Sequence, residues 1–478
     1  MIPGQYSYLN EQIEMDNPMT KPTESSLDQV RGPDIAYIMK GYPRLSDVFI
    51  NNEIYLLESM GLTLRIFSAK KPAGEKIHSV VNNILAIVTY LPEVTSISAT
   101  SLFSWLRTNL PRFVSSHLYL CRLHPRSYIK TLFDAVGMSF KYRQTFFSTP
   151  KKVFFQEFLQ AGYIAQQVLE SGRIGHLHGH FCHGSTTITM FVSQLSGIPF
   201  SFTAHAKDIY LQKLNPSDLL STKIRRARFV VTCTSANSRY LKSICPDVSS
   251  IHTIYHGLDT TLFTPALPRH DHAVPLLLSV GRFVEKKGFS YLVQACRTLK
   301  DRGYAFQCRL VGEADEHTDL IKQLIIELSL QDTVFVDGPV TQEELRQIYN
   351  ECRVFALPCQ VLENGDRDGI PNVLVEAMAM EIPVVSTDIS GIPELIEHRL
   401  DGLLVPQRDA SALAGALEEL LKEPSLRRQL GQNGRDKVRR LFDNKKTTLS
   451  LRKLFASCLE TQRGRGADEH HTDINHAA

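Results

Sequence analysis

The chain has 478 residues, of which 43% are hydrophobic and 22% are charged. These values are near the average for globular proteins, so they exclude a mainly disordered, collagen-like or multi-span membrane protein. The 53 basic and 50 acidic residues leave a net charge of +3, which gives no reason to expect a nucleic-acid partner. Nine cysteines without a close Cys-x-x-Cys pair indicate free thiols in a reducing compartment.

The first half of the chain predicts a tail followed by an α/β domain. Residues 1–33 are polar and lack the basic and apolar regions of a secretory signal, so we expect a disordered tail. Strand and helix patterns then alternate, except that residues 77–160 are mostly helical or irregular. The predicted elements are strands at 34–39, 64–68, 198–204 and 229–232, and a helix at 48–61.

The second half has a clearer pattern. A proline-rich segment at 265–275 is the best candidate for a linker. Apolar runs without alternation then recur every ~20–30 residues between helical patterns, which is typical of βαβ units and a parallel sheet. Thr341 and Glu344 form a capping-box pattern at the start of one helix. The predicted strands are 275–280, 306–311, 333–336, 353–357, 382–386 and 402–405, and helical patterns cover 289–299 and 317–330.

The architecture that follows is α/β, with two doubly wound Rossmann-like domains facing a deep cleft. We expect an N-terminal domain at 34–264, a C-terminal domain at 265–440, and a helix at 441–460 that returns to the N-terminal domain. We expect a disordered tail at 461–478. Ligands of such sheets bind beyond the carboxyl ends of the strands.

Two short segments carry candidate chemistry. Arg282 lies five residues ahead of Lys287, between a predicted strand end and a helix start, where phosphate groups bind readily. Asp368 precedes a second predicted helix and Glu376 lies two turns into it, so both carboxylates are placed to face the cleft and hold sugar or ribose hydroxyls. The alternatives are solvated surface cations, a helix cap and a surface glutamate.

These segments resemble a known family. The motifs V-G-R-x4-K-G, D-G-I-P-x4-E-A-M-A and P-V-V-S-T-x3-G-I-P-E-L-I are similar to those of glycosyltransferase family 4, which contains retaining enzymes of GT-B fold. The segments 39–46, 178–181 and 202–208 resemble the exopolysaccharide branch of the colanic acid and amylovoran type. The resemblance covers roughly residues 35–455.

The resemblance implies roles for individual residues. Arg282 and Lys287 would grip the donor diphosphate and stabilise it as it leaves. Glu376 would contact the donor ribose, and Asp368, where the family has Glu, would contact the transferred sugar. His205 would be the cleft histidine near the reacting sugar. The implied catalytic set is His205, Asp368, Arg282 and Lys287, and the further donor-binding residues are Glu376, Gly369, Ile370, Pro371, Asn372 and Gly41.

Two other patterns resemble metal sites. Asp366 and Asp368 match the D-x-D motif of metal-dependent glycosyltransferases, but that motif belongs to another fold. His176, His178, His180 and His183 cluster with Cys182, but neighbouring side chains on a strand point to opposite faces and cannot all reach one ion. Lining of the cleft and packed histidines are the other interpretations. We therefore expect no metal and no cofactor.

Residues 101–155 are basic and aromatic. They carry nine basic side chains and one acidic side chain, Asp134. Aromatic and aliphatic residues lie between them, which favours contact with an anionic membrane. The alternative is that the aromatics form core and the cations an ordinary solvated face. The basic residues are Arg107, Arg112, Arg122, Arg126, Lys130, Lys141, Arg143, Lys151 and Lys152.

The function that the resemblance implies is retaining transfer of a hexose from a nucleotide-diphosphate sugar, with UDP or GDP, to a glycan or polyprenyl-linked acceptor in exopolysaccharide biosynthesis. The expected location is the cytoplasm, with peripheral contact at the inner face of the cell membrane. The alternative is a non-catalytic nucleotide-sugar-binding protein of the same fold.

Overall fold

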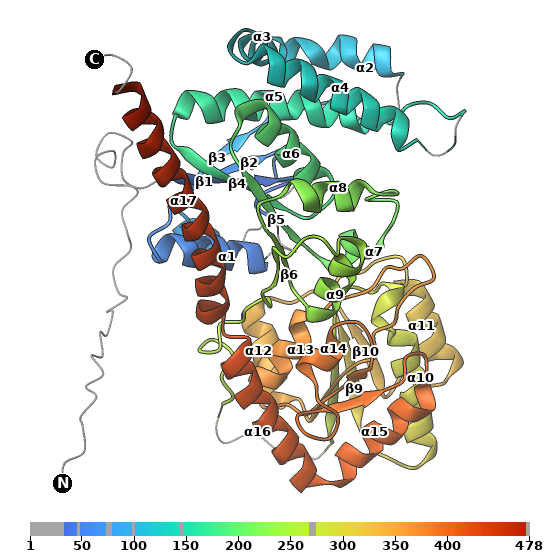
Figure 1. The fold of residues 1–478 in the computed structure, drawn as a ribbon. Coiled ribbons are helices and arrows are strands. Elements are labelled where there is room, and N and C mark those ends of the chain that lie inside the picture. The colour runs from blue at the N-terminus through green and yellow to red at the C-terminus, as the bar shows by residue number, and fades with distance from the viewer. Residues whose placement is uncertain are drawn as a thin grey trace, which may run out of the picture.

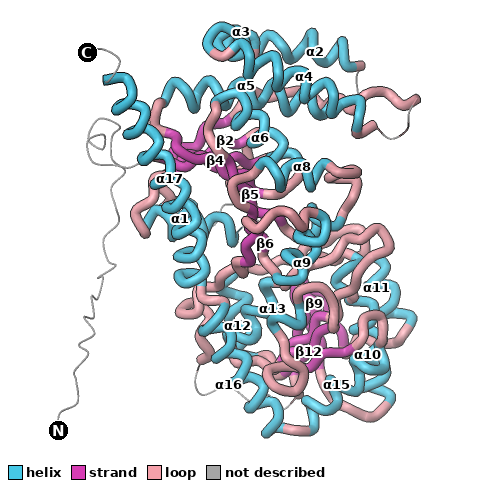
Figure 2. The backbone as a smooth tube through the Cα atoms, in the orientation of Figure 1, coloured by secondary structure: helices cyan, strands magenta, loops and turns pink. Residues whose placement is uncertain are grey.

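The computed structural model describes residues 33–44, 48–72, 79–97, 101–143, 145, 147–266 and 274–474, with only the backbone described for 461–474. Two α/β domains follow one another along the chain, and in each the strands lie inside a shell of helices (Figures 1 and 2). The predicted N-terminal tail and most of the predicted linker lie outside the described residues.

The N-terminal domain contains a seven-stranded sheet in the order β3-β2-β1-β4-β5-β6-β7, and all its strands are parallel. The predicted strands do not include β3 and β7, and β4 enters only as the strand on which the histidine pattern was placed. β4 has the sequence IGHLHGH, whose glycines and histidines conceal a buried strand, while β3 and β7 are short. The strands are β1 (Asp34–Met39), β2 (Leu64–Ser68), β3 (Ile87–Tyr90), β4 (Ile174–His180), β5 (Phe200–Ala204), β6 (Val230–Thr232) and β7 (Ile251–Thr253).

The C-terminal domain contains a six-stranded parallel sheet in the order β10-β9-β8-β11-β12-β13. The parallel pairing confirms the predicted arrangement, and every apolar run proposed for this half overlaps one strand. Thr341 and Glu344 form the predicted capping box at the start of α12 (Gln342–Glu351). The strands are β8 (Leu276–Val280), β9 (Gln307–Val311), β10 (Val334–Asp337), β11 (Val354–Leu357), β12 (Val384–Thr387) and β13 (Leu403–Val405).

Helices cover both sheets. Those of the N-terminal domain are α1 (Val48–Ser59), α2 (Leu102–Asn109), α3 (Val114–Leu123), α4 (Pro125–Lys141), α5 (Val153–Ser171), α6 (Gly184–Ser196), α7 (Ala206–Tyr210), α8 (Leu219–Arg226) and α9 (Ser235–Ile244). Those that follow are α10 (Phe289–Asp301), α11 (Thr318–Glu327), α12, α13 (Asn372–Ala379), α14 (Ile392–Leu395), α15 (Ala410–Lys422), α16 (Pro424–Leu441) and α17 (Asn444–Ile474).

The chain passes between the domains twice, and the two passages touch. Leu258 donates its backbone N–H to Phe442 over 2.7 Å, and Asn444 donates to the Leu258 carbonyl over 3.0 Å. An added Cβ on Gly257 would lie only 2.2 Å from the Asn444 Cα, so the two segments approach as closely as backbones allow. Helix α17 starts at this point and runs back along α1 and β4 of the N-terminal domain (Figure 1).

Helix α17 completes the core of the N-terminal domain. Phe455 is fully buried, and its ring centroid lies 5.1 Å from that of His178 and 5.7 Å from that of Phe229. The helix extends to Ile474, beyond its predicted end at residue 460. No proline follows Asn444, so nothing removes a backbone donor from the helical hydrogen-bond pattern.

Replacing Phe455 tests how far the N-terminal domain depends on this helix. Phe455→Ala should lower the free energy of unfolding by about 3–5 kcal/mol, because it removes a buried ring and leaves a cavity. Leu449→Ala is the control in the same helix, since Leu449 is 41% exposed, and should change stability by less than ~0.5 kcal/mol. Chemical denaturation measures both, and equal effects would contradict a structural role for α17.

Candidate active site

The loops at the carboxyl end of β8 carry the predicted phosphate-binding cations. Arg282 follows β8, and the short 3-10 helix Glu285–Lys287 presents Lys286 and Lys287. Gly288 ends this turn at a φ of 70°, and a Cβ there would lie 1.9 Å from the Pro358 carbonyl oxygen. Only glycine fits at this position, and it allows the two lysines to lie against the loop that follows β11.

Two lysines surround Asp368. Lys287 Nζ lies 2.7 Å from Asp368 Oδ2, and Lys286 Nζ lies 3.2 Å from Asp368 Oδ1. Burial acts to raise the pKa of Asp368, but the charges and hydrogen bonds of Lys287 and Lys286 outweigh it and hold the pKa well below its usual range. Burial acts to lower the pKa of Lys287, and Asp368 more than compensates, so this pKa is raised. The Asp368 carboxylate and the Lys287 ammonium group therefore stay charged at neutral pH.

Arg282 lies at the edge of this cluster. It is about half exposed, and its guanidinium lies 3.2 Å from Asp315 Oδ2. It is also near enough to Lys287 to act on the pKa of that lysine. The structure thus brings Lys287 and Asp368 into direct contact and leaves Arg282 beside them with a solvent-exposed partner.

Glu376 lies in a different environment from Asp368. It is two turns into α13 and accepts a hydrogen bond of 3.0 Å from the Tyr349 hydroxyl. Burial raises the pKa of Glu376 to about 7, although the Tyr349 hydrogen bond acts in the opposite direction. A carboxyl with this pKa can donate or accept a hydrogen bond near neutral pH, which suits contact with a hydroxyl-rich ligand.

The turn before α13 faces the N-terminal domain. An added Cβ on Gly369 would lie 3.2 Å from Thr234 and 3.6 Å from the Cys233 sulfur. Pro371 is the N-cap residue of α13. Ile370 and Asn372 line a small cavity between the domains, together with Cys233, His256, Val375 and Phe442.

His205 occupies the carboxyl end of β5, opposite that turn. It is 8% exposed, and its ring lies between those of Phe181 at 4.6 Å and His256 at 5.1 Å. Burial first, and neighbouring histidines second, lower its pKa well below the usual value, so the imidazole is neutral. Its Nε2 is buried without a hydrogen-bond partner among the described residues, so it is available to a ligand.

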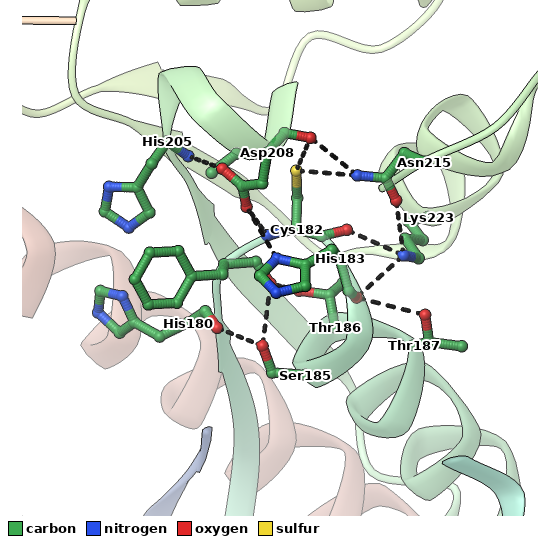
Figure 3. A network of polar contacts seen from close by, with 12 residues as sticks. His180, Cys182, His183, Ser185, Thr186, Thr187, His205, Asp208, Asn215 and Lys223 are labelled. Carbon is green, nitrogen blue, oxygen red and sulfur yellow. Dashed lines mark hydrogen bonds and ion pairs between the residues drawn. The ribbon is translucent and has the colours of Figure 1, made fainter. Parts of the chain in front are cut away.

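A buried polar network holds the His205 loop in place (Figure 3). Asp208 accepts hydrogen bonds from the backbone N–H of His205 at 2.8 Å and from that of Cys182. Asn215 donates to the Asp208 carbonyl at 2.9 Å. The fully buried Lys223 donates to the carbonyls of Cys182 and His183 and to the Asn215 side chain, at 2.9–3.0 Å. The network fixes the loops after β4 and β5 relative to each other.

The even-numbered histidines of the suspected metal cluster lie on β4 and bond to side chains of other elements. His176 and His178 point from β4 toward α17 and share the Ser201 hydroxyl, at 2.7 and 2.8 Å. His178 also contacts Thr203 at 3.0 Å. Both are therefore packed histidines. His180, bonded to Glu53 at 3.1 Å, lies near His205, so only the end of the motif reaches the site.

Three other residues are placed to hold a metal. His205, Cys233 and His256 offer ligand atoms that lie within 4.8 Å of one another. Sequence reasoning missed Cys233 and His256, although each follows a strand of the N-terminal sheet, as His205 does. Both could have been found from the sequence, because residues that directly follow adjacent parallel strands gather at one edge of the sheet. The Asp366–Asp368 pair, in contrast, already has a cation between its carboxylates: Lys286 Nζ lies 3.1 Å from Asp366 and 3.2 Å from Asp368.

Glu394 joins the two domains. Its carboxylate accepts hydrogen bonds of 2.7 Å from the backbone N–H groups of Ser235 and Ala236, at the start of α9, and one of 3.0 Å from the Tyr255 hydroxyl. A carboxylate at a helix N-terminus satisfies unpaired donors and interacts favourably with the helix dipole. This contact connects α14 with the N-terminal domain beside the site.

Gly41, the last of the predicted donor-binding residues, lies in the loop after β1. The nearest atom to an added Cβ would be Arg44 Cδ, at 3.5 Å. This is an ordinary contact distance, so the structure shows no steric need for glycine here.

The pKa of Glu376 makes stability depend on pH. Between pH 4.5 and about 7 the folded state keeps a proton on Glu376 that the unfolded state has released, so stability falls as the pH rises through this window. Glu376→Gln should remove this part of the pH dependence. Denaturation of both proteins from pH 4 to pH 8 measures it, with the exposed Glu351→Gln as control. Parallel curves for the parent and Glu376→Gln would contradict the raised pKa.

Comparison with known proteins connects this geometry with a family. Residues 266–437 match the family described as glycosyl transferases group 1. The amylovoran biosynthesis glycosyltransferase AmsK of Erwinia amylovora is 40% identical over 37% of this chain and 43% of its own length. The putative colanic acid biosynthesis glycosyltransferase WcaL of Salmonella typhimurium is 35% identical over 50% and 57%. The matches therefore span about half the length of these relatives.

Solved structures confirm the fold over most of the chain. Anabaena HepE in complex with UDP-glucose has a TM-score of 0.63 at 14% identity, and the superposition covers 89% of this chain and all of that one. With two parallel-sheet domains joined as described, the fold is GT-B. Within this fold, the match to the glycosyl transferases group 1 covers the part of the chain that carries the C-terminal sheet.

Proposed function

We propose that this protein is a retaining glycosyltransferase that moves a hexose from a nucleoside-diphosphate sugar to a glycan or lipid-linked acceptor in exopolysaccharide biosynthesis. The observation that carries the proposal is the group of Arg282, Lys286 and Lys287 at the carboxyl end of β8, opposite a neutral His205 with an available nitrogen. The group 1 domain and the named relatives support transfer of a sugar as the reaction.

The cations suit the charge that such a reaction creates. Breaking the bond between a sugar and a diphosphate builds negative charge on the leaving group, and fixed cations stabilise that charge. Lys287 and Arg282 now interact with Asp368 and Asp315, so an arriving diphosphate would share or replace these carboxylate partners. Lys287 remains protonated at neutral pH, because its pKa is raised. A metal ion is therefore not required at the diphosphate.

Three further residues complete the proposed donor site. Asp368 is ionised, and its lysine partners hold it where a carboxylate can accept a hydrogen bond from a sugar hydroxyl. Glu376 would bind the ribose through its protonatable carboxyl. The neutral imidazole of His205 can bond to a sugar hydroxyl without placing a full positive charge beside the sugar cation that develops.

Different comparisons support the proposed donor and the proposed acceptor. HepE, a structure of the same fold, is described in complex with UDP-glucose, so UDP-sugars are the first donors to test and GDP-sugars the second. The relatives are named for amylovoran and colanic acid biosynthesis, which favours a growing glycan as acceptor. A lipid-linked acceptor would bring the enzyme to the inner face of the cell membrane.

Incubation with radiolabelled UDP- and GDP-sugars and a lipid extract tests the function. A transferase should release free nucleotide and move the label to the acceptor fraction, with retained anomeric configuration in the product. Donor binding, measured by thermal shift, without nucleotide release would contradict the proposal and favour a nucleotide-sugar-binding protein.

The diphosphate contacts are tested by substitution. Arg282→Ala and Lys287→Ala should each lower kcat by about 10²-fold or more, as expected for loss of one electrostatic donor to the leaving group. Lys322→Ala is the control, since Lys322 is an exposed lysine of α11 in the same domain. Near-parental rates for Arg282→Ala or Lys287→Ala, with folding confirmed by circular dichroism, would show that the replaced residue does not stabilise the diphosphate.

Metal independence is a separate prediction. Activity should survive EDTA, because lysine and arginine supply the positive charge at the leaving group. Assays after EDTA treatment, with and without added Mn²⁺, Mg²⁺ or Zn²⁺, measure this. Loss of activity in EDTA that a metal restores would contradict the prediction, and restoration by Zn²⁺ would direct attention to His205, Cys233 and His256.

A further inference from the structure

Large hydrophobic side chains are exposed mainly in one part of the molecule. Among the described residues, eighteen large hydrophobic side chains are exposed, and ten of these lie within residues 101–155. Phe103 and Phe133 are 80% and 71% exposed. The ten are Phe103, Leu110, Val114, Leu118, Leu123, Ile129, Phe133, Phe140, Phe147 and Val153. The sequence left open whether the aromatic residues of 101–155 form core. Trp105 and Phe113 do, but these ten hydrophobic side chains are exposed.

Helix α4 shows how the exposed residues are arranged. One face is buried and consists of Thr131, Ala135, Met138 and Ser139. The opposite face is exposed and is both apolar and basic. Its residues are Arg126, Ile129, Lys130, Phe133 and Phe140, which follow the helical spacing of three, four and seven positions. A helix that presents this second face to water alone would be unusual, because exposed faces are normally polar.

The neighbouring helices continue this surface. Phe103 and Arg107 are exposed on α2, and Leu118 and Arg122 are exposed on α3. Helices α3 and α4 pack against α5, and α2, α3 and α4 form a layer at the end of the N-terminal domain that lies away from the C-terminal domain (Figure 1). We call this layer, residues 102–141, the α2–α4 face.

The charge of the α2–α4 face is almost entirely positive. The only acidic residue within 101–155 is Asp134, which is bonded to Arg226 at 3.1 Å and to Gln194 at 2.7 Å. Lys141 pairs with Asp218. Within the described part of the chain, no acidic side chain pairs with Arg107, Arg122, Arg126 or Lys130. These four cations are therefore available to an external anionic partner.

We propose that the α2–α4 face docks onto an anionic lipid bilayer. Isolated cations beside exposed aromatic and aliphatic side chains suit a surface of acidic headgroups above an apolar interior. Within the described residues, no helix combines the length and the apolar character of a membrane span. That a lipid-linked acceptor is met there rests on the proposed function, whereas the docking itself does not.

Binding to vesicles, without donor or acceptor, tests the docking. We compare sedimentation with vesicles of phosphatidylcholine and with vesicles of equal parts phosphatidylcholine and phosphatidylglycerol, at low and high salt. The protein should bind the anionic vesicles at low salt and bind the neutral ones weakly, and high salt should reduce binding. The variant Lys130→Glu with Phe133→Ser should bind anionic vesicles about tenfold more weakly or worse, since it reverses one charge and removes one apolar contact.

A matched control exists in the C-terminal domain. Lys322 and Ile326 are an exposed basic and apolar pair on α11, and Ile326 is 62% exposed. Lys322→Glu with Ile326→Ser should bind like the parent. Equal binding of the parent and the α4 variant, equal binding to neutral vesicles, or no binding at low salt would overturn the proposal. So would a dimer, detected by light scattering, that the α4 variant dissociates without any vesicle binding.

Failure of docking and failure of the proposed function are distinguishable. Release of nucleotide from a sugar donor needs no vesicles, so a variant that loses vesicle binding but retains this reaction affects docking alone. Circular dichroism and thermal unfolding verify that both double variants are folded, which is expected because all four side chains are exposed.

Discussion

All strands within each sheet run in the same direction, and this constraint determines where chemistry can occur. Parallel strands end together at one edge, where loops are released from the hydrogen-bonding pattern and polar side chains can gather. At that edge the N-terminal sheet presents His205, and the C-terminal sheet presents Arg282 and the two lysines. Glu394 reaches from one domain to the start of α9 in the other, so the two edges are held facing each other.

The buried charges of this region tolerate burial because each has a partner. Lys223 is fully buried but donates to three oxygens, and Lys286 and Lys287 are neutralised by aspartates. Removing one member of such a group leaves an uncompensated charge, which costs far more than the pair contributes. Asp366 and Asp368 therefore compensate the charge of the buried lysines in this structure.

The sequence predicted the class of the fold well, because long apolar runs separated by helical patterns have few other solutions. It failed where the local pattern was broken. Strand β4 is buried on both sides, yet histidine and glycine make it appear polar. The groups that bond to or pack against its histidines, Ser201, Thr203 and α17, come from other parts of the chain. The same limit applies to the site. Spacing suggested Arg282, Lys287 and Asp368 but could not show that Lys286 shares Asp368, or that Cys233 and His256 lie beside His205.

The two touching passages of the chain between the domains have a mechanical consequence. Two connections far apart would restrict relative movement of the domains to the axis that joins them, whereas two connections that touch restrict it to rotation about one point. Leu258, Phe442 and Asn444 define this point, and the small Gly257 lets the two segments of the chain lie in contact. A change in the angle between the domains at this point would leave both sheets intact, but it would have to release the hydrogen bonds from Ser235 and Ala236 to Glu394.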